Sequence, residues 1–141
     1  MSERFLVKVY TPKGLVFEKS SDYLRLPGAS GDVGIFYDHT PSLLKCIEGE
    51  MVIKSQNQTH AFFITDSIAH VNKDDVVLIV NSLESIENLD EKRAKASKDR
   101  AIERIEAARK NMNSDIDVSR AKRSLNRAEI RLEILLKHQL K

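Results

Sequence analysis

The residues best suited to chemistry are four arginines near the carboxyl end of the chain. They are Arg120, Arg123, Arg127 and Arg131. Their spacings of three, four and four residues place them on one face of an α-helix. Guanidinium groups present a planar fork of donors that matches carboxylates and phosphates. Residues 116–141 hold seven Lys and Arg against three Asp and Glu, so few acids offset this face. The stripe is either a solvated helix face or a surface that meets an acidic partner.

A glycine-rich segment, residues 27–34, has the composition of a phosphate-binding loop but not its spacing. Its glycines read G-x-x-G-x-x-G, and no Gly-Lys-Ser or Gly-Lys-Thr follows. No helix begins there on which a phosphate could sit. We expect a tight excursion between strands that uses positive backbone angles.

Cysteine and histidine form no recognisable catalytic or metal-binding set. Cys46 is the single cysteine and lies in the apolar run Leu43–Ile47, so we expect a small buried residue and not a nucleophile. A chain that cannot form an internal disulfide is typical of a reducing compartment. The histidines (39, 60, 70 and 138) are scattered, and one cysteine cannot complete a typical zinc set. We expect neither an enzyme nor a metal protein.

The residues before position 81 follow the period of β-strands. Phe5, Val7 and Val9 alternate with polar neighbours. Seven further short runs follow, separated by turn signals: Leu15–Phe17, Tyr23–Leu26, Ser42–Ile47, Met51–Ile53, Ala61–Thr65, Ile68–Val71 and Val76–Val80. Short strands this closely spaced, with no helix between them, predict an antiparallel β-sandwich or barrel over residues 1–84.

From residue 88 the period changes to that of helices. Asn88, followed three residues later by Glu91, is a helix start in which the amide caps and the carboxylate reaches back. Residues 111–114 then break this helix, and Ser114 is placed to cap a second one. The first helix has an apolar stripe of Ala94, Ala101, Ile105, Ala108 and Met112.

The second helix has a heptad seam with spacings of three and four residues. Its members are Val118, Ala121, Leu125, Ala128, Leu132 and Leu135. Two helices with a short connection pack antiparallel, and alanines on the seam allow a close approach. The sequence therefore predicts an antiparallel two-helix hairpin over residues 88–141.

Charge separates the two halves of the chain. Residues 1–87 hold 8 Lys and Arg against 12 Asp and Glu, whereas residues 88–141 hold 15 against 9. A basic hairpin on a weakly acidic body indicates that the hairpin meets an acidic surface. No apolar stretch approaches the roughly 18 residues that span a bilayer, so we expect membrane association only through a partner.

Several ordered segments resemble the epsilon subunit of the bacterial-type F-type ATP synthase. Leu26-Pro27-Gly28, Gly31–Ile35 and Asp38–Leu44 are similar to its L-P-G, G-x-x-G-I and H-x-P-L-L segments. Glu87–Ala94 is similar to its E-D-L-D-E-x-R-A linker. In the tail, Ile116–Ala121 resembles I-D-x-x-R-A, followed by L-x-R-A and R-L. Together these segments cover nearly the whole chain.

The resemblance implies a non-catalytic rotor subunit at the foot of the central stalk, peripheral to the cytoplasmic face of a bacterial membrane. It also implies that residues 1–84 form a β-sandwich, followed by the two-helix hairpin. The sandwich would bind the gamma subunit and the membrane ring of c subunits, and would transmit rotation between proton or sodium flow and ATP synthesis. Asp32 and His39 fall where family members approach the c ring. For His39, a hydrogen bond that holds the turn before Pro41 is an equal alternative.

The resemblance makes the hairpin a regulatory element. It would lie folded on the sandwich or extend along gamma to the catalytic head. There the stripe Arg120, Arg123, Arg127 and Arg131 would meet an acidic segment of the beta subunit, and hydrolysis would be blocked. No cofactor is required. In some members ATP binds the hairpin as a regulatory ligand, with Asp117 on the adenine amino group and Arg120 and Arg127 on the phosphates. Alternatively, Asp117 stabilises the amino end of the second helix.

Two segments depart from the family pattern. Ile35-Phe36-Tyr37 stands where members have Ile-Leu-Pro or Ile-Tyr-Pro, and Thr65–Ile68 replaces a Gly-Gly turn. Both are near edges expected to bind partners. The absence of a transit peptide favours a bacterial subunit, with a plastid-encoded one left open.

Two rival functions fit parts of the sequence. A nucleic-acid-binding module would use the basic hairpin, but residues 88–141 contain no Phe, Tyr or Trp on which bases could stack. An unrelated coiled-coil adaptor would explain the seam but not the glycine and His-x-Pro segments.

Overall fold

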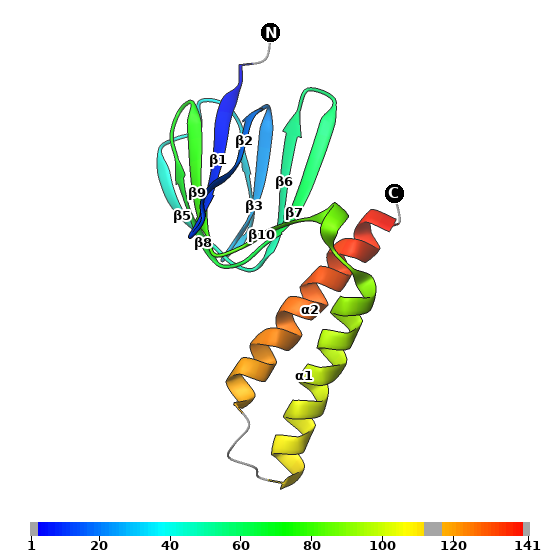
Figure 1. Ribbon diagram of the computed structural model, residues 1–141. Helices are drawn as coiled ribbons and strands as arrows, with labels where there is room; N and C mark the ends of the chain where they lie inside the picture. Colours follow the sequence, from blue (N-terminus) through cyan, green and yellow to red (C-terminus); the bar gives the residue numbers. More distant parts are fainter. Residues whose placement is uncertain (1–2, 112–116, 140–141) are drawn as a thin grey trace. The chain divides into compact units, whose positions relative to one another are not determined.

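The computed structural model describes residues 3–111 and 117–139, and the chain divides into two compact units, Met1–Ile86 and Glu87–Lys141. The first unit is built of strands and the second of helices (Figure 1). The strands are β1 (Phe5–Thr11), β2 (Gly14–Ser21), β3 (Tyr23–Gly28), β4 (Gly31–Ile35), β5 (Ser42–Cys46), β6 (Gly49–Ser55), β7 (Gln58–Ile64), β8 (Ser67–Val71), β9 (Asp75–Val80) and β10 (Leu83–Ser85). A short 3-10 helix, Ile86–Asn88, precedes α1 (Glu91–Asn111) and α2 (Val118–Gln139).

The strands form one hydrogen-bonded ladder that folds over itself into two layers. Its order is β10-β7-β6-β3-β5-β8-β9-β1-β2, with β4 paired to β3. The pairing of β1 with β9 is parallel, and the other pairings are antiparallel. β3 and β5 share only the pair Gly28 and Cys46, so the ladder turns from one layer to the other there. At the opposite side, Ser55 Oγ donates to Ser20 O over 2.6 Å and joins β6 to β2.

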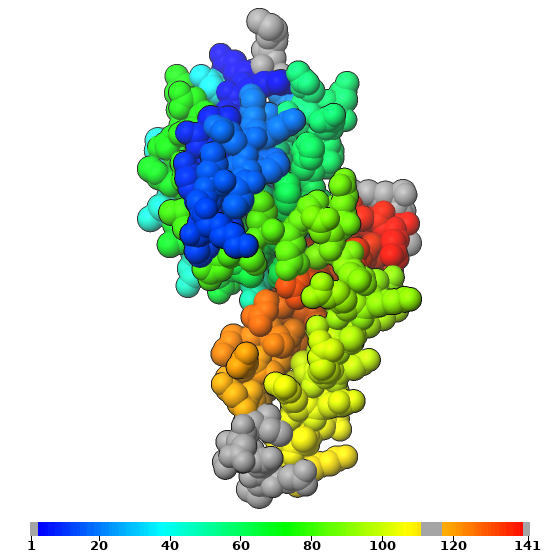
Figure 2. Space-filling model, in the orientation of Figure 1, coloured from blue at the N-terminus to red at the C-terminus, as the bar shows by residue number. Residues whose placement is uncertain are grey.

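The core of the first unit lies between the two layers and confirms the predicted alternation. Phe5, Val7 and Val9 are at most 2% exposed, and their intervening neighbours are half-buried. Each of the eight predicted runs overlaps a strand, and the strands extend up to four residues beyond the predicted ends. In Figure 2 the side chains of β1 and β2, in blue, cover one face of this unit. The predicted β-sandwich is therefore confirmed.

The glycine-rich segment differs from the expected excursion, because it is mostly strand. β3 continues to Gly28, and β4 returns from Gly31 as its antiparallel partner. Of the three glycines in this segment, only Gly31 has a positive φ, of 123°. At Gly28 a Cβ atom would lie 2.7 Å from the carbonyl oxygen of Gly31, so the close approach of the backbone explains that glycine. The sequence reasoning missed β4 because its two glycines have no side chains that could show the alternation of a strand. It missed β10 because three residues are too few to show a period.

The second unit is the predicted antiparallel hairpin, with α1 and α2 side by side (Figure 1). Ala94, Ala101, Ala121 and Ala128 are at most 5% exposed and form its buried seam. The larger apolar residues of the predicted stripes are half-buried. Small side chains at the centre allow the helices to approach closely, so the stripe of each helix packs on the other.

The helix starts differ in detail from those expected. Asp90, and not Asn88, caps α1, since Asp90 Oδ1 accepts hydrogen bonds from Lys92 N at 2.9 Å and Arg93 N at 3.2 Å. Asn88 belongs to the preceding 3-10 helix. The predicted cap Ser114 and the stripe residue Met112 lie outside the described residues. At the start of α2, Asp117 Oδ1 accepts from Arg120 N at 3.0 Å.

Candidate functional site

The predicted arginine stripe lies along α2. Arg120 and Arg123 are exposed, whereas Arg127 and Arg131 are half-buried. All four lie between Asp117, which caps the helix, and its last described turn, where Lys137 and His138 add basic groups. The first two arginines of the stripe are therefore accessible to solvent, and the last two are partly covered by other residues.

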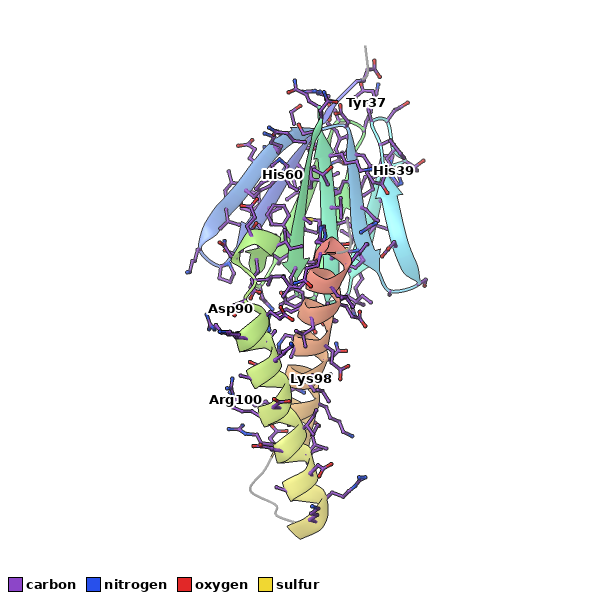
Figure 3. The ribbon with its side chains drawn as sticks, turned by 90° about the vertical axis from the view of Figure 1, so that its right-hand side faces the viewer. Tyr37, His39, His60, Asp90, Lys98 and Arg100 are labelled. Atoms are coloured by element: carbon purple, nitrogen blue, oxygen red, sulfur yellow. The ribbon has the colours of Figure 1, made fainter. Side chains whose placement is uncertain are left out.

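Arg120 also lines a polar cavity of about 180 Å³ between α1 and α2. We call it the arginine pocket, and its lining residues are Ser97, Arg100, Ala101, Arg104, Arg120, Ala121 and Ser124. Arg100 Nη2 donates to Ser97 Oγ at 3.1 Å. Figure 3 shows Asp90 at the first turn of α1 and Arg100 further along the same helix. Three guanidinium groups thus surround one small space.

Two of these arginines were missed by the sequence reasoning. Arg100 and Arg104 are one helical turn apart, with Ser97 on the same side of α1. That spacing is visible in the sequence, but α1 carries many charged residues at similar spacings. Only the pairing of α1 with α2 brings these two arginines to Arg120.

Asp117 and Arg127, the other residues predicted to bind ATP, do not line the arginine pocket. Asp117 caps α2 instead, as the alternative interpretation expected. The same Asp-x-x-Arg-Ala order begins α1, where Asp90 is the cap and Ala94 enters the seam. In this structure the motif therefore forms helix starts that place an alanine on the seam one turn later.

Asp32, predicted to approach the c ring, takes part in a cross-strand ion cluster. Its side chain is 64% exposed, and its Oδ2 lies 3.8 Å from Arg25 Nε. Arg25 Nη2 also donates to Glu50 Oε1, whose side chain is only 9% exposed. Arg25 on β3 thus pairs with Glu50 on β6 and places a positive charge beside Asp32 on β4.

His39 holds the turn before Pro41, as its alternative interpretation expected. Its Nδ1 lies 2.7 Å from Thr40 O, and a carbonyl oxygen can only accept, so Nδ1 donates. The preceding Asp38 has a φ of 65°, and its backbone N donates to Lys73 O at 2.9 Å. Asp32 is the second residue of β4, whereas His39 comes after the other end of that strand. Figure 3 shows His39 beside Tyr37 at one end of the sheet.

An apolar groove that the sequence reasoning missed lies on the outer face of β5, β8 and β9. Its volume is about 610 Å³, and its lining includes Leu43, Ile68 and Ile79. These side chains are 72%, 51% and 61% exposed. Ile68 pairs directly with Ile79 across β8 and β9, so the apolar surface is continuous. Exposed apolar surface of this kind is typical of protein interfaces.

The two departures from the family pattern have local structural roles. Phe36, 62% exposed, packs on Tyr23 with ring centroids 4.8 Å apart. Gly34 leaves room for this arrangement, since a Cβ atom there would lie 3.1 Å from the Tyr23 ring. Thr65 Oγ1 accepts a hydrogen bond from Ser82 N at 3.2 Å and ties the turn after β7 to the chain after β9.

The remaining candidates for chemistry have structural explanations. Cys46 is 1% exposed, and burial raises the pKa of its thiol, which disfavours the nucleophilic thiolate. Among residues 3–111 and 117–139, no group of three or more His, Cys, Asp or Glu could hold a metal ion. Within the same residues, no helix is both long and apolar enough to cross a membrane.

Comparison with known families accounts for both units. Residues 4–86 match the beta-sandwich domain of the ATP synthase delta/epsilon chain, and residues 87–135 match the long alpha-helix domain of the same chain. The chain therefore belongs to the ATP synthase delta/epsilon chain family, and within it to the epsilon chains of F-type ATP synthases.

Curated relatives match over nearly their whole length. The ATP synthase epsilon chain of Nitratidesulfovibrio vulgaris is 30% identical over 95% of this chain and 97% of its own. That of Francisella philomiragia is 33% identical over 96% and 92%, and that of Bacillus velezensis is 30% identical over 91% and 94%. Bacterial epsilon chains thus share both units with this chain, in the same order.

Solved structures support the fold. A chain in the Euglena gracilis mitochondrial ATP synthase, solved as OSCP/F1/c-ring in rotational state 1, has a TM-score of 0.73 at 13% identity and covers 100% of this chain and 84% of that one. A chain in the Tetrahymena thermophila central stalk and c-ring structure has a TM-score of 0.53 at 15% identity, over 62% and 71%.

Proposed function

We propose that this chain is a non-catalytic rotor subunit of the central stalk, coupling ion-driven rotation of the c ring and gamma subunit to ATP synthesis. The observation that carries the proposal is the family match across both units, joined by the exposed apolar groove on the sandwich. A subunit of this kind sits on the cytoplasmic face of the membrane and is held there by its partners.

The apolar groove is the proposed docking surface for the gamma subunit. Leu43, Ile68 and Ile79 are more than half exposed, and burying such side chains stabilises an interface by about 25 cal/mol for each Å² of apolar surface removed from water. An interface that turns with its partner needs stable contact, which an apolar centre provides. The turn between β3 and β4, with Asp32 beside it, is the proposed contact with the c ring. His39 is the second proposed contact with the c ring.

The hairpin is the proposed regulatory element. Its extended form would bring Arg120, Arg123, Arg127 and Arg131 to an acidic segment of the beta subunit and inhibit hydrolysis. Exposed ion pairs are worth about 0.2–1 kcal/mol each, so the stripe biases the equilibrium and does not lock it. We also propose that the hairpin responds to ATP as a regulatory ligand. The arginine pocket supports this through Arg120, while the cap formed by Asp117 leaves adenine recognition to be tested.

Reconstitution of the ATP synthase with and without this chain tests the proposal. We expect complexes that lack the chain to lose ATP synthesis driven by an ion gradient, because torque from the c ring would no longer reach gamma. Equal gradient-driven synthesis in both preparations would contradict the proposed coupling role.

A matched pair of variants tests the docking surface. Ile79→Glu places a charge in the apolar groove, whereas Val16→Glu places one at an exposed position of β2 outside it. We expect Ile79→Glu to weaken binding to gamma at least about tenfold and Val16→Glu to change it about twofold or less, since a charge at an apolar interface centre must be desolvated. Similar affinities for the two variants would remove the groove from the interface.

A further inference from the structure

β4 and the residues that follow it turn one face to the sandwich core and the other to solvent. The residues that pack against the core are Val33, Ile35 and Tyr37. Because side chains alternate along extended chain, Asp32, Gly34 and Phe36 lie on the opposite face, and all three are exposed. The solvent face of β4 therefore carries a large aromatic side chain, 62% exposed, that the core does not use.

Phe36 is held in place although it is exposed. Its ring packs on that of Tyr23, with centroids 4.8 Å apart and planes at 40°. Tyr23 lies over Gly34, where a Cβ atom would be 3.1 Å from both its Cε1 and its Oη. On the neighbouring strand β6, Lys54 Nζ lies 5.6 Å from the centre of the Tyr23 ring. A side chain that is already ordered loses less conformational freedom on binding, so Phe36 is preorganised for contact with a partner.

The position of Phe36 lies between the two residues proposed to contact the c ring. Asp32 is on the same face of β4, four residues earlier, and His39 follows three residues later. Tyr37, next to Phe36 in the chain, lies with His39 at one end of the sheet (Figure 3). A partner that contacts both Asp32 and His39 must therefore cover the stretch that carries Phe36.

We propose that Phe36, supported by Tyr23, is the apolar anchor of the contact with the c ring, that is, the side chain buried at its centre. This inference rests on the proposed contacts of Asp32 and His39 and supplies the apolar centre that they lack. Interfaces commonly place aromatic side chains at the centre and polar groups at the rim. A ring of identical subunits repeats the same surface at equal angles. An anchor seated on one such surface would fix the angle of the stalk on the ring, as the transfer of torque requires.

Binding of the full-length chain, in complex with gamma, to the purified c ring in detergent tests the proposal. We expect Phe36→Ala to weaken ring binding at least about tenfold and Phe36→Leu to stay within about threefold of the unmodified chain, because leucine keeps an apolar side chain. Val16→Ala is the matched control, since Val16 is an exposed apolar residue of β2, 45% exposed. It should change ring binding about twofold or less. An equal effect of Phe36→Ala and Val16→Ala would overturn the proposal.

Two further measurements separate the anchor from a general loss of structure and from the polar contacts. Phe36→Ala should leave the affinity for gamma unchanged, and a loss of gamma binding with ring binding intact would overturn the proposal. Its effect on ring binding should be the same at low and at high salt, whereas that of Asp32→Ala should shrink as salt screens the carboxylate.

Failure of the anchor and failure of the c ring contact give different results. If Asp32→Ala or His39→Ala weakens ring binding and Phe36→Ala does not, the proposed contact stands and the anchor is wrong. If the complex of the unmodified chain with gamma does not bind the ring, both are wrong.

Discussion

At the residue scale, Arg25 lies between a nearly buried carboxylate, Glu50, and Asp32, which is predicted to contact the c ring. Glu50 is nearly buried, and its carboxylate receives the guanidinium of Arg25, which also approaches the exposed Asp32. A shielded carboxylate that loses its cationic partner keeps its desolvation cost. Arg25 therefore compensates the charge of Glu50 and places a positive charge beside Asp32.

Replacing Arg25 by alanine should destabilise the first unit by about 2 kcal/mol, because Glu50 would lose a charge-assisted hydrogen bond. Urea unfolding, followed by a spectroscopic signal of the sandwich, measures this change. Arg4→Ala is the control, since the Arg4–Asp22 pair has side chains that are 33% and 28% exposed. Because both of these side chains are more accessible than Glu50, we expect a smaller loss, below about 1 kcal/mol. Equal losses for the two variants would contradict the role given to Glu50.

Cys46 gives the sandwich a pH dependence on the alkaline side. Burial raises the pKa of its thiol above the ordinary value. The folded state therefore holds the thiol proton more tightly than the unfolded chain does. This contribution to stability is fully present below the unfolded thiol pKa, about 8.5, and is lost as pH rises through the folded value.

The prediction is a difference between two pH profiles. The free energy of unfolding of the unmodified chain should fall more steeply between about pH 8 and pH 10 than that of Cys46→Ala, which has no thiol to ionise. Any cavity left by the substitution lowers stability equally at every pH, so the two slopes can be compared directly. Parallel profiles from chemical denaturation would show that the thiol does not titrate differently on folding.

At the scale of elements, both helices begin with the same device. Asp90 and Asp117 cap α1 and α2, and the residue four positions later, Ala94 or Ala121, enters the buried seam. The cap determines where each helix starts, and the start determines which residues face the partner helix. A motif associated with nucleotide binding thus has a structural role in this hairpin.

Asp117→Ala should destabilise the hairpin by about 1 kcal/mol, whereas Asp117→Asn should retain most of its stability, since asparagine caps as well as aspartate does. Thermal unfolding followed by far-ultraviolet circular dichroism measures both. Asp99→Ala, an exposed substitution within α1, is the control and should change little. A loss for Asp117→Asn as large as that for Asp117→Ala would mean that the charge matters and the hydrogen bond does not.

At the scale of the whole molecule, the two units have separate cores. The sandwich core is formed by residues between Phe5 and Val80, and the hairpin seam by residues of α1 and α2. Structural stability and the proposed regulation therefore reside in different parts of the chain, and a truncation can separate them.

A chain ending at residue 86 should keep the sandwich and lose the inhibition of hydrolysis. Its melting temperature, followed by calorimetry, should remain within a few degrees of that of the sandwich transition in the full chain, because the core residues are all retained. Complexes assembled with the truncated chain should hydrolyse ATP faster than those with the full chain. A truncated chain that fails to fold, or that inhibits equally, would contradict this division.

The sequence by itself determined the two architectures, most of the strands, the alanine seam and the burial of Cys46. These follow from local periods of 2 and 3.6 residues, which depend on backbone geometry and not on distant contacts. The sequence also identified Arg120 as a candidate binding residue. Only the tertiary structure decided that Arg100 and Arg104 join Arg120, that β4 pairs with β3, and that Leu43, Ile68 and Ile79 share one exposed groove. Each of these arrangements brings together residues from different elements. The alternation of a strand assigns its side chains to two faces, but it does not say which other element covers either face.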